Sequence, residues 1–446
     1  MAGIRLSRGQ KVPLTNGQTI TVIDELGMGG QGIVYRVRLD NTGEEKALKW
    51  YFPKKIKDGQ GGQKFYARLR DNNISQGSPS DAFVWPEALT EWVNGTFGYV
   101  MKLYPPEYKG FPRYLIGTTK FADMTAKINA GLNISTAFKH LHNYGWNYQD
   151  LNDGNFAIDP KTGKVLICDN DNVVGHGQDS GVLGKPRYMA PEIVRGEAKP
   201  NKTTDRYSLA VILFMLLIRN HPLEGKKTNV PALTYKYQKR FFGDEPLFIF
   251  DSKDNSNAPR ESVHAPAIKF WPYLPEFMQD AFRKSFSKES LLKAEGRFLE
   301  EQWIHLFMRL KSSMIKCANC GDIIFAAGDS PTVCPNCHKN INVAGYLKFA
   351  KRTDVNIIVP LSSGAKLYDY HITNNTDSSE SYEKVVATVL EKPGKIGLRN
   401  DSKNAWTISA PNGKTAIKNP GETAVMHIGF KIDFGNKTVA EVVSNK

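Results

Sequence analysis

The chain has 446 residues, of which 41% are hydrophobic and 23% charged, and its formal net charge is +14. This length predicts two or three domains, and the composition is that of a globular protein rather than a disordered or fibrous one. The longest apolar run, residues 209–218, is too short to cross a bilayer, and the first ten residues lack the apolar core of a secretion signal, so we expect a cytoplasmic protein without a membrane segment. Lysine and arginine are spread along the chain without a long run, which does not favour nucleic-acid binding.

A glycine-rich segment follows the first predicted strand, residues 19–25. Gly27, Gly29 and Gly32 fit the pattern G-x-G-x-x-G, in which a loop without β-carbons lets backbone N–H groups close over phosphates. Residues 33–39 alternate like a second strand, whereas a dinucleotide-binding fold would begin a helix here. The segment predicts a hairpin with a phosphate-binding turn, although glycine-rich hairpins are also common without a ligand.

A further predicted strand ends at Lys49, seventeen positions after Gly32. A lysine in a strand usually faces solvent, but its register with the glycine loop favours a residue that contacts phosphate. The helix candidate that follows, residues 62–73, contains no glutamate, and its carboxylate is Asp71. Residues 83–89 and 98–103 predict two more strands of the same sheet.

Residues 146–171 carry the densest set of candidate catalytic side chains. Asp150 is followed five positions later by Asn155, and a predicted buried strand leads to Asp169 and Asp171. Metal-dependent phosphoryl transfer needs one carboxylate that orients the attacking hydroxyl, and an amide and a carboxylate that hold Mg²⁺ against nucleotide phosphates. The alternative is a surface loop rich in Asp and Asn before a hairpin, because both residues favour turns.

These motifs, in this order, resemble the protein-kinase signature. The run YQDL at residues 148–151 stands where H-R-D-L is usual, DND at 169–171 stands where D-F-G is usual, and residues 190–192 match A-P-E. The resemblance implies an α+β, bilobal protein-kinase fold over residues 19–310. Its N-lobe would comprise residues 19–103 and its C-lobe residues 104–310.

The same resemblance implies a role for each site residue. Asp150 would be the catalytic base, and Lys49 would anchor the phosphates. Asn155, Asp169 and Asp171 would hold Mg²⁺ or Mn²⁺. The nucleotide would be ATP, bound by Leu26, Gly27, Gly29, Gly32, Val34, Ala47, Lys49, Met101, Lys102 and Leu103.

Two structural contacts are also implied by the resemblance. Asp205 opens a strongly apolar helix and would hydrogen-bond the backbone of the catalytic loop. Arg297 would pair with Glu192 of the A-P-E motif.

Several positions depart from the family pattern. Kinases pair the strand lysine with a glutamate of the following helix, and that glutamate is missing here. Asp71 is a weak stand-in, so either the ion pair is remade differently or the helix is displaced or replaced. D-F-G is also altered, and Asn152 stands where serine/threonine kinases usually carry a lysine. Gln149 replaces an arginine that grips a phosphorylated activation loop in many kinases, so we expect activity that does not require such phosphorylation. Two hypotheses follow. The chain is a protein serine/threonine kinase, or it is a nucleotide-binding pseudokinase that acts as a scaffold.

Four cysteines, Cys317, Cys320, Cys334 and Cys337, form the pattern C-x₂-C-x₁₃-C-x₂-C. Each pair places two thiolates on one side of a tight turn, and two such turns complete a tetrahedron around Zn²⁺. The pattern predicts a structural zinc ribbon over residues 314–342. A redox dithiol pair or a rubredoxin-like iron site are the alternatives.

The remaining residues, 355–446, alternate apolar and polar side chains between turn signals and predict a small all-β sandwich. The run GLRNDS at 397–402 and the run IDFG at 432–435 resemble forkhead-associated phosphopeptide-binding domains. A plain interaction sandwich is the favoured alternative, because the full set of phosphate-gripping residues is not evident.

A kinase followed by a zinc ribbon and a β-domain is similar to bacterial Hanks-type serine/threonine kinases. One such group is encoded beside a von Willebrand A-domain protein and a PP2C-type phosphatase in tellurite-resistance and stress-response clusters. The resemblance implies these two proteins as partners, a protein as substrate and a role in bacterial stress signalling.

Overall fold

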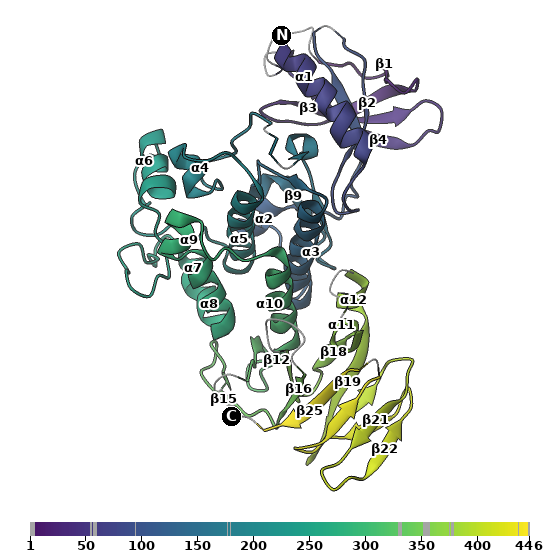
Figure 1. The fold of residues 1–446 in the computed structure, drawn as a ribbon, viewed down its shortest axis with the longest axis vertical. Coiled ribbons are helices and arrows are strands. Elements are labelled where there is room, and N and C mark those ends of the chain that lie inside the picture. Colours follow the sequence, from purple (N-terminus) through teal and green to yellow (C-terminus); the bar gives the residue numbers. More distant parts are fainter. Residues whose placement is uncertain are drawn as a thin grey trace. The chain divides into compact units, whose positions relative to one another are not determined.

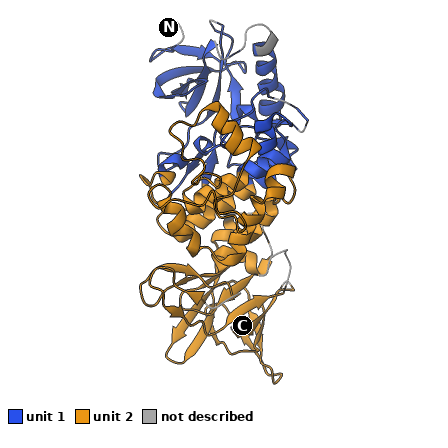
Figure 2. Ribbon diagram, turned by 90° about the vertical axis from the view of Figure 1, so that its left-hand side faces the viewer, with its two compact units in different colours: residues 1–113, 137–160, 165–208 blue, residues 114–136, 161–164, 209–446 orange. Residues whose placement is uncertain are grey.

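The computed structural model describes residues 5–53, 56, 60–93, 95–175, 177–178, 180–328, 332–350, 357–373, 375, 379–435 and 437–444 (Figure 1). The chain divides into two compact units (Figure 2). Unit 1 comprises residues 1–113, 137–160 and 165–208, and unit 2 comprises residues 114–136, 161–164 and 209–446. None of the described helices is long and apolar enough to cross a membrane.

Unit 1 begins with a six-stranded antiparallel sheet in the order β1-β2-β3-β4-β6-β5. In β3 every second residue is buried, and Ile33, Tyr35 and Val37 pack with strands β1 and β2 in one core on that face. The sheet starts at Lys11, so it extends before the predicted boundary at residue 19. The strands are β1 (Lys11–Pro13), β2 (Thr19–Met28), β3 (Gly32–Leu39), β4 (Glu45–Tyr51), β5 (Pro86–Leu89) and β6 (Gly98–Lys102).

Helix α1 (Gln60–Arg68) and the single π-helical turn η2 (Leu69–Ile74) follow β4. The α1 residue Phe65 packs edge-on against Tyr51 of β4 and tilts against Phe97, at centroid distances of 5.2 and 5.7 Å. This aromatic group holds α1 against the sheet face that carries Lys49.

The rest of unit 1 is a set of short elements around the predicted catalytic loop. Strand β9 pairs with β10 on one side and β7 on the other, and β8 pairs with β11. These elements are β7 (Lys109–Gly110), β8 (Trp146–Asn147), η3 (Asp153–Asn155), β9 (Phe156–Ile158), β10 (Val165–Ile167), η4 (Asn170–Asn172), β11 (Val174–Gly175) and α4 (Pro191–Arg195).

Unit 2 contains most of the helices, and α2, α3 and α5 have residues in both units. Its apolar core includes edge-on rings of Phe214, Phe248, Trp271 and Phe282. The helical elements are α2 (Phe111–Leu115), α3 (Met124–Asn143), α5 (Lys202–Ile218), α6 (Tyr235–Lys239), η5 (Arg240–Asp244), α7 (Ala265–Phe270), η6 (Trp271–Tyr273), α8 (Glu276–Ser285), α9 (Lys288–Lys293) and α10 (Glu300–Ser312).

Two small hairpins follow α10, and then two larger sheets, one six-stranded and one four-stranded, enclose a common core (Figure 1). The six-stranded sheet has the order β17-β16-β25-β24-β21-β22, and the four-stranded sheet has the order β18-β19-β20-β23. Because β16 starts at Tyr346, this domain begins before the predicted boundary at residue 355, which itself lies outside the described residues. The elements are β12 (Met314–Lys316), β13 (Ile323–Phe325), β14 (Thr332–Val333), β15 (Asn340–Ile341), β16 (Tyr346–Phe349), β17 (Ile358–Pro360), β18 (Lys366–Tyr368), α11 (Asp369–Thr373), α12 (Ser379–Glu383), β19 (Val385–Lys392), β20 (Lys395–Asn400), β21 (Trp406–Ser409), β22 (Thr415–Lys418), β23 (Thr423–Val425), β24 (Lys431–Asp433) and β25 (Val439–Val443).

The two-sheet domain is joined to helix α10 by buried polar contacts. The Lys311 ammonium donates to the backbone oxygen of Tyr382, and to Asn129 Oδ1 at 2.8 Å. Ser312 Oγ lies 2.8 Å from His371 Nε2 and 2.9 Å from Tyr370 Oη. Helix α10 and the short helices of the two-sheet domain therefore share one interior.

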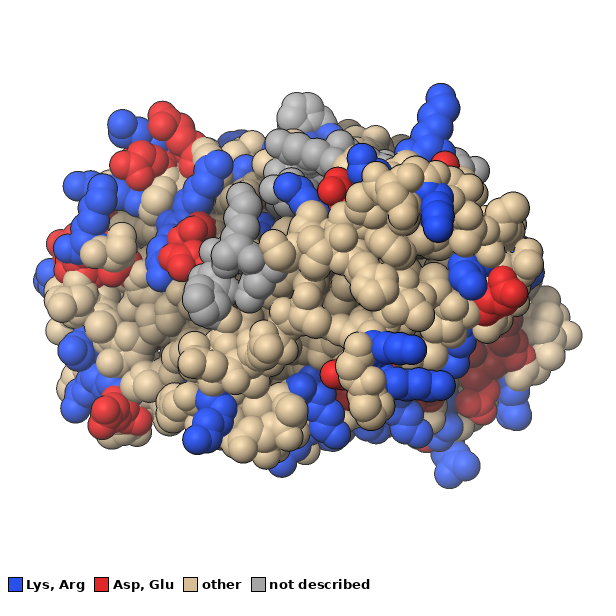
Figure 3. Space-filling model, turned by 90° about the horizontal axis from the view of Figure 1, so that it is seen from below, with Lys and Arg blue, Asp and Glu red and all other residues tan. Residues whose placement is uncertain are grey.

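The surface charge is mixed. On the face that Figure 3 shows, Lys and Arg side chains are scattered among Asp, Glu and uncharged residues and form no continuous basic area. This pattern agrees with the even spread of basic residues along the sequence.

Candidate active site

The β9–β10 hairpin brings two predicted metal ligands to the same end of one sheet. Phe156 pairs with Ile167, so Asn155 just before β9 lies beside the residues that follow β10. The Cys168 amide donates to the Asn155 backbone oxygen at 2.7 Å. Asp169 then adopts a left-handed conformation, with φ 57° and ψ 45°, and begins the short helix η4.

A buried aspartate fixes the backbone of the predicted catalytic loop. Asp205 Oδ2 accepts from the Tyr148 amide at 2.6 Å, and its Oδ1 accepts from the Gln149 amide at 3.2 Å. His142 Nε2 lies 3.3 Å from the same carboxylate. These are the hydrogen bonds that the family resemblance implied for Asp205. The other implied contact, between Glu192 and Arg297, involves one residue of each unit and stays a prediction.

Within the loop, amide side chains orient the candidate base. Asn155 Nδ2 donates to the Asp150 backbone oxygen at 3.1 Å and to Tyr148 Oη at 2.9 Å. Asn152 Nδ2 donates to Asp150 Oδ1 at 3.2 Å. Burial raises the pKa of Asp150, while Lys185 and the Asn152 amide oppose that rise.

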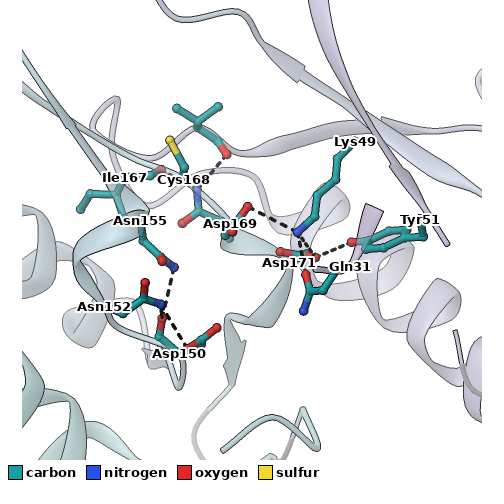
Figure 4. Close-up of polar contacts among 12 residues, drawn as sticks. Gln31, Lys49, Tyr51, Asp150, Asn152, Asn155, Ile167, Cys168, Asp169 and Asp171 are labelled. Carbon is teal, nitrogen blue, oxygen red and sulfur yellow. Dashed lines mark hydrogen bonds and ion pairs between the residues drawn. The ribbon is translucent and has the colours of Figure 1, made fainter. Parts of the chain in front are cut away.

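Lys49 reaches the carboxylates that follow β10 (Figure 4). Its ammonium donates to Asp171 Oδ2 at 2.9 Å and to Asp169 Oδ1 at 3.4 Å, and also to Gln31 Oε1 at 2.9 Å. Burial opposes the charge of Lys49, but Asp171 and Asp169 outweigh burial and raise the pKa of the lysine. Lys49 is therefore a charged group in a site with two carboxylates.

Asp71, the weak stand-in for the missing helix glutamate, does not pair with Lys49. Asp71 binds its neighbour Arg70, with N···O distances of 2.7 and 3.1 Å, and both side chains are more than half exposed. Helix α1 instead contributes Arg68, whose Nη2 donates to the Asp171 backbone oxygen at 2.9 Å. The carboxylate that a kinase helix normally supplies to the lysine comes here from the DND motif.

Asp171 is almost completely buried, with 1% of its side chain exposed. Its Oδ2 accepts from Lys49 and from the Tyr51 hydroxyl, and its Oδ1 has no hydrogen-bond partner in the part of the chain that the structure describes. Burial raises the pKa of Asp171, but Lys49 and Tyr51 more than compensate, so the pKa lies below its usual value. One oxygen of Asp171 is thus engaged by the ion pair, and the other remains for the predicted metal contact.

The set of oxygen atoms fits a hard divalent cation. The Asp169 side chain is about half exposed, and both hydrogen bonds of the Asn155 amide described above use its nitrogen, which leaves its oxygen as an acceptor. Carboxylate and amide oxygens are the ligands that Mg²⁺ takes from proteins. Asn155 and Asp169 are the residues that would hold it.

The residues predicted to contact the base of a nucleotide gather in one apolar cluster. Val34, Ala47, Met101 and Leu103 belong to it, together with Leu166 of β10. Leu166 and its neighbour Cys168, which packs against the same cluster, were not foreseen, because apolar residues in a buried strand look like ordinary core. Leu26 and Lys102 are exposed at the margin.

The glycines of the β2–β3 hairpin have different roles. A β-carbon on Gly32 would lie 2.1 Å from the Trp50 backbone oxygen, so only glycine fits there. A β-carbon on Gly27 or Gly29 would meet nothing within 4 Å. Gly32 thus permits close strand packing, and Gly27 and Gly29 leave open space where the sequence predicts phosphates.

The four cysteines of the predicted zinc ribbon lie within 4.8 Å of one another, measured between sulfur atoms. The Cys317–Cys337 and Cys320–Cys334 sulfur distances are 3.7 and 3.6 Å. A tetrahedral site with Zn–S bonds of about 2.3 Å has S···S edges of roughly 3.8 Å, so the group has the size that zinc requires.

Two matching turns build this thiol group. The Gly321 amide donates to the Cys317 oxygen, and the His338 amide donates to the Cys334 oxygen, each at 2.9 Å. Gly321 and His338 both have positive φ, 77° and 57°. The repeated geometry explains why the two C-x₂-C pairs present their sulfurs to one point.

Comparison with known proteins agrees with this architecture. Residues 20–270, more than half of the chain, match the family model described as "Protein kinase domain". The chain is 29% identical to human beta-adrenergic receptor kinase 1 over 219 residues, which are 46% of this chain and 29% of that protein. It is 34% identical to mouse protein kinase C delta type over 96 residues, 21% of this chain and 14% of that protein. It is 31% identical to a probable serine/threonine-protein kinase PLK of Dictyostelium discoideum over 112 residues, 25% of this chain and 12% of that protein.

The chain belongs to the protein kinase family. It spans less than a third of the length of each of these three relatives. ATP and Mg²⁺ are the nucleotide and cation that the family's domain implies.

Proposed function

We propose that the chain is an ATP- and Mg²⁺-dependent protein kinase that phosphorylates serine or threonine hydroxyls of protein substrates. The observation that carries this proposal is the ion pair between Lys49 Nζ and Asp169 Oδ1, at 3.4 Å, beside the loop that bears Asp150 and Asn155. Lys49 and Asp169 are 120 positions apart in sequence. A fold with no phosphoryl chemistry has no need to bury a charged lysine against two carboxylates at this point.

Each side chain then has one task. Lys49 would hold the phosphates of ATP, and Asp150 would accept the proton of the attacking hydroxyl. Asn155 and Asp169 would hold Mg²⁺, whose positive charge would offset charge on the phosphate oxygens. The apolar cluster with Val34, Ala47 and Met101 would receive the adenine ring.

The activation segment, residues 172–187 between the DND and A-P-E motifs, is held at Gln149 by neutral groups, which supports activity without its phosphorylation. Ser180 Oγ and the Ser180 amide both donate to Gln149 Oε1, at 2.6 and 3.0 Å, and Gln149 Nε2 donates to the Gln178 oxygen at 3.1 Å. We expect phosphatase treatment to leave the rate unchanged. A rate that falls on dephosphorylation would contradict this part of the proposal.

The test is transfer of labelled phosphate from ATP to dephosphorylated casein and to the chain itself, with Mg²⁺ present. Wild type should transfer label to serine and threonine, and Asp150→Ala should transfer none. Asp71→Ala is the matched control, because it removes a carboxylate that the structure places outside the site. Equal label with wild type and Asp150→Ala would end the enzymatic proposal. It would favour the pseudokinase scaffold, to which the lack of a helix glutamate and of a lysine at position 152 also points.

The finer assignments are proposals as well. We propose structural zinc at the four cysteines, supported by their spacing, and an interaction role for the two-sheet domain. In that domain Arg399, the basic residue of the forkhead-like run, is paired with Asp401 at 2.5 Å, which favours a plain interaction surface over phosphopeptide capture. The proposed cytoplasmic location rests on the two C-x₂-C pairs, because thiolate metal ligands indicate a reducing compartment. Bacterial stress signalling, and partnership with a von Willebrand A-domain protein and a PP2C-type phosphatase, rest on the family resemblance of the sequence.

A further inference from the structure

The predicted catalytic loop lacks a cation of its own. The residue two positions after Asp150 is Asn152, which is neutral and almost completely buried. The ammonium of Lys49 lies nearby but is paired with the carboxylates of Asp169 and Asp171. Transfer of a phosphoryl group beside a carboxylate benefits from a positive charge that offsets charge on the moving group.

A lysine of the activation segment lies next to this position. Lys185 Nζ donates to Asn152 Oδ1 at 2.8 Å. Asn152 in turn donates through Nδ2 to Asp150 Oδ1 at 3.2 Å and to the Asp150 backbone oxygen at 3.0 Å. Asn152 Oδ1 also accepts from the Gly154 amide at 3.1 Å, which fixes the orientation of its amide group. The chain of contacts runs from the lysine to the candidate base through one oriented side chain.

The backbone holds Lys185 at this place. Gly184 has φ +93°, and a β-carbon there would lie 3.2 Å from the Gln149 oxygen and 3.5 Å from Asp150 Oδ1. The Lys185 backbone oxygen accepts from the Tyr188 and Met189 amides, at 2.8 and 3.0 Å. The positive φ favours glycine at this position, and the turn that follows fixes the direction in which the lysine leaves the chain.

The exposure of Lys185 indicates that its ammonium is available to a substrate. The Lys185 side chain is exposed, so its charge has not been buried in the core. Its hydrogen bond to the catalytic loop goes to the Asn152 side chain, which also donates to the candidate base.

We propose that Lys185 supplies, from the activation segment, the catalytic cation that contacts the transferring phosphoryl group beside Asp150. This inference rests on the proposed function. In the reaction the acceptor oxygen forms a bond to the γ-phosphorus, and the bond from that phosphorus to the bridging oxygen of ADP breaks. The hydroxyl proton passes to Asp150, ADP leaves with the bonding electron pair, and Lys185 keeps its protons throughout.

The experiment compares kcat and the KM for ATP in wild type and four variants. Lys185→Met should lower kcat roughly 100-fold, as for the loss of one charged contact to a transition state, with the KM for ATP changed less than about threefold. Lys185→Arg should retain at least a tenth of wild-type kcat. Lys64→Met removes an exposed lysine on α1 and should match wild type. Melting temperatures and binding of a non-hydrolysable ATP analogue check that each variant is folded.

A double variant distinguishes a catalytic role of the Lys185 charge from a purely structural contact between the activation segment and the catalytic loop. Asn152→Lys combined with Lys185→Met returns a positive charge to the loop without restoring the contact to the activation segment. Recovery of kcat by tenfold or more over Lys185→Met supports the proposal. No recovery overturns it, and so does wild-type kcat in Lys185→Met. If wild type itself transfers no phosphate, the proposed function fails as well. If wild type is active, Asp150→Ala is inactive and Lys185→Met is normal, only the Lys185 inference fails.

Discussion

Changing Asp171 to asparagine tests the unusual ion pair at the centre of the site. The substitution keeps the shape of the side chain and removes its charge. Lys49 would then have one carboxylate left, that of Asp169, which is farther away at 3.4 Å and about half exposed. The Lys49 side chain is only 7% exposed, so water offers its ammonium little compensation for the lost carboxylate.

The expected magnitude follows from burial. Removing one partner of a buried ion pair costs about 3–5 kcal/mol, because the remaining charge is left uncompensated. The asparagine oxygen can still accept a hydrogen bond from Lys49 or Tyr51, which offsets roughly 1 kcal/mol. We therefore expect Asp171→Asn to lower the unfolding free energy by about 2–4 kcal/mol. The exposed Asp71–Arg70 pair is the control. Asp71→Asn should change the free energy of unfolding by less than about 1 kcal/mol.

The assay is urea unfolding followed by tryptophan fluorescence, since Trp85 and Trp146 of unit 1 stack at 4.9 Å. A double-mutant cycle with Lys49→Met adds a direct measure of coupling. The loss in Asp171→Asn should shrink in the Lys49→Met background, because no buried cation remains to be compensated. Equal losses in both backgrounds, or a loss no larger than in Asp71→Asn, would refute the argument that Asp171 replaces the missing helix carboxylate.

Three other predictions concern unit 2. Purified wild-type chain should carry one zinc ion by elemental analysis. Cys334→Ser should lose the zinc and be cleaved more readily by proteases around residues 314–342, whereas the control Cys168→Ser should keep the zinc. Burial lowers the pKa of Lys311 to about 7. Between pH 7 and 10 the unfolded chain therefore holds a proton on this lysine that the folded chain has released, so the free energy of unfolding rises with pH across that window. Lys311→Met should flatten this rise in denaturant titrations. Gly131→Ala should destabilise the protein by about 1–3 kcal/mol despite the better helix propensity of alanine, because the new methyl group would lie 2.1 Å from the Phe307 ring.

Each of these has an outcome that contradicts it. Zinc retained in Cys334→Ser at one equivalent would mean that the metal is bound elsewhere. An unchanged pH slope in Lys311→Met would assign the slope to other groups. A gain in melting temperature for Gly131→Ala would show that α3 and α10 can move apart at no cost.

The sequence was informative where a motif acts through local spacing. Asp150 and Asn155 share one loop, and the strand that precedes Asp169 could be foreseen from its apolar run, so the hairpin that brings them together was predictable. The cysteine group follows in the same way, because each C-x₂-C pair is a local turn. The start of the two-sheet domain was placed too late, since β16 is too short to give a clear alternation and its partner β25 lies near the end of the chain.

The contacts that could not be foreseen join distant segments. Nothing in the spacing of residues shows that Asp171, rather than a helix residue, faces Lys49, because that depends on the turn that Asp169 makes in the left-handed region. Lys185 is hidden for the same reason. It follows a glycine in a stretch without a motif. Only the approach of that glycine to the catalytic loop brings the lysine next to Asn152.

The shared interior of α10 and the two-sheet domain bears on how this protein can be divided. The family match ends at residue 270, and the sequence alone would end the catalytic part near 310, yet Lys311 and Ser312 each have a hydrogen-bond partner beyond residue 365. A chain cut at either point would lose Lys311 and Ser312, and the buried side-chain oxygen of Asn129 would lose its lysine donor. The two-sheet domain could therefore not be exchanged in evolution as freely as a domain on a linker. Substitutions in α10 at these contacts should be accompanied by substitutions in the two-sheet domain.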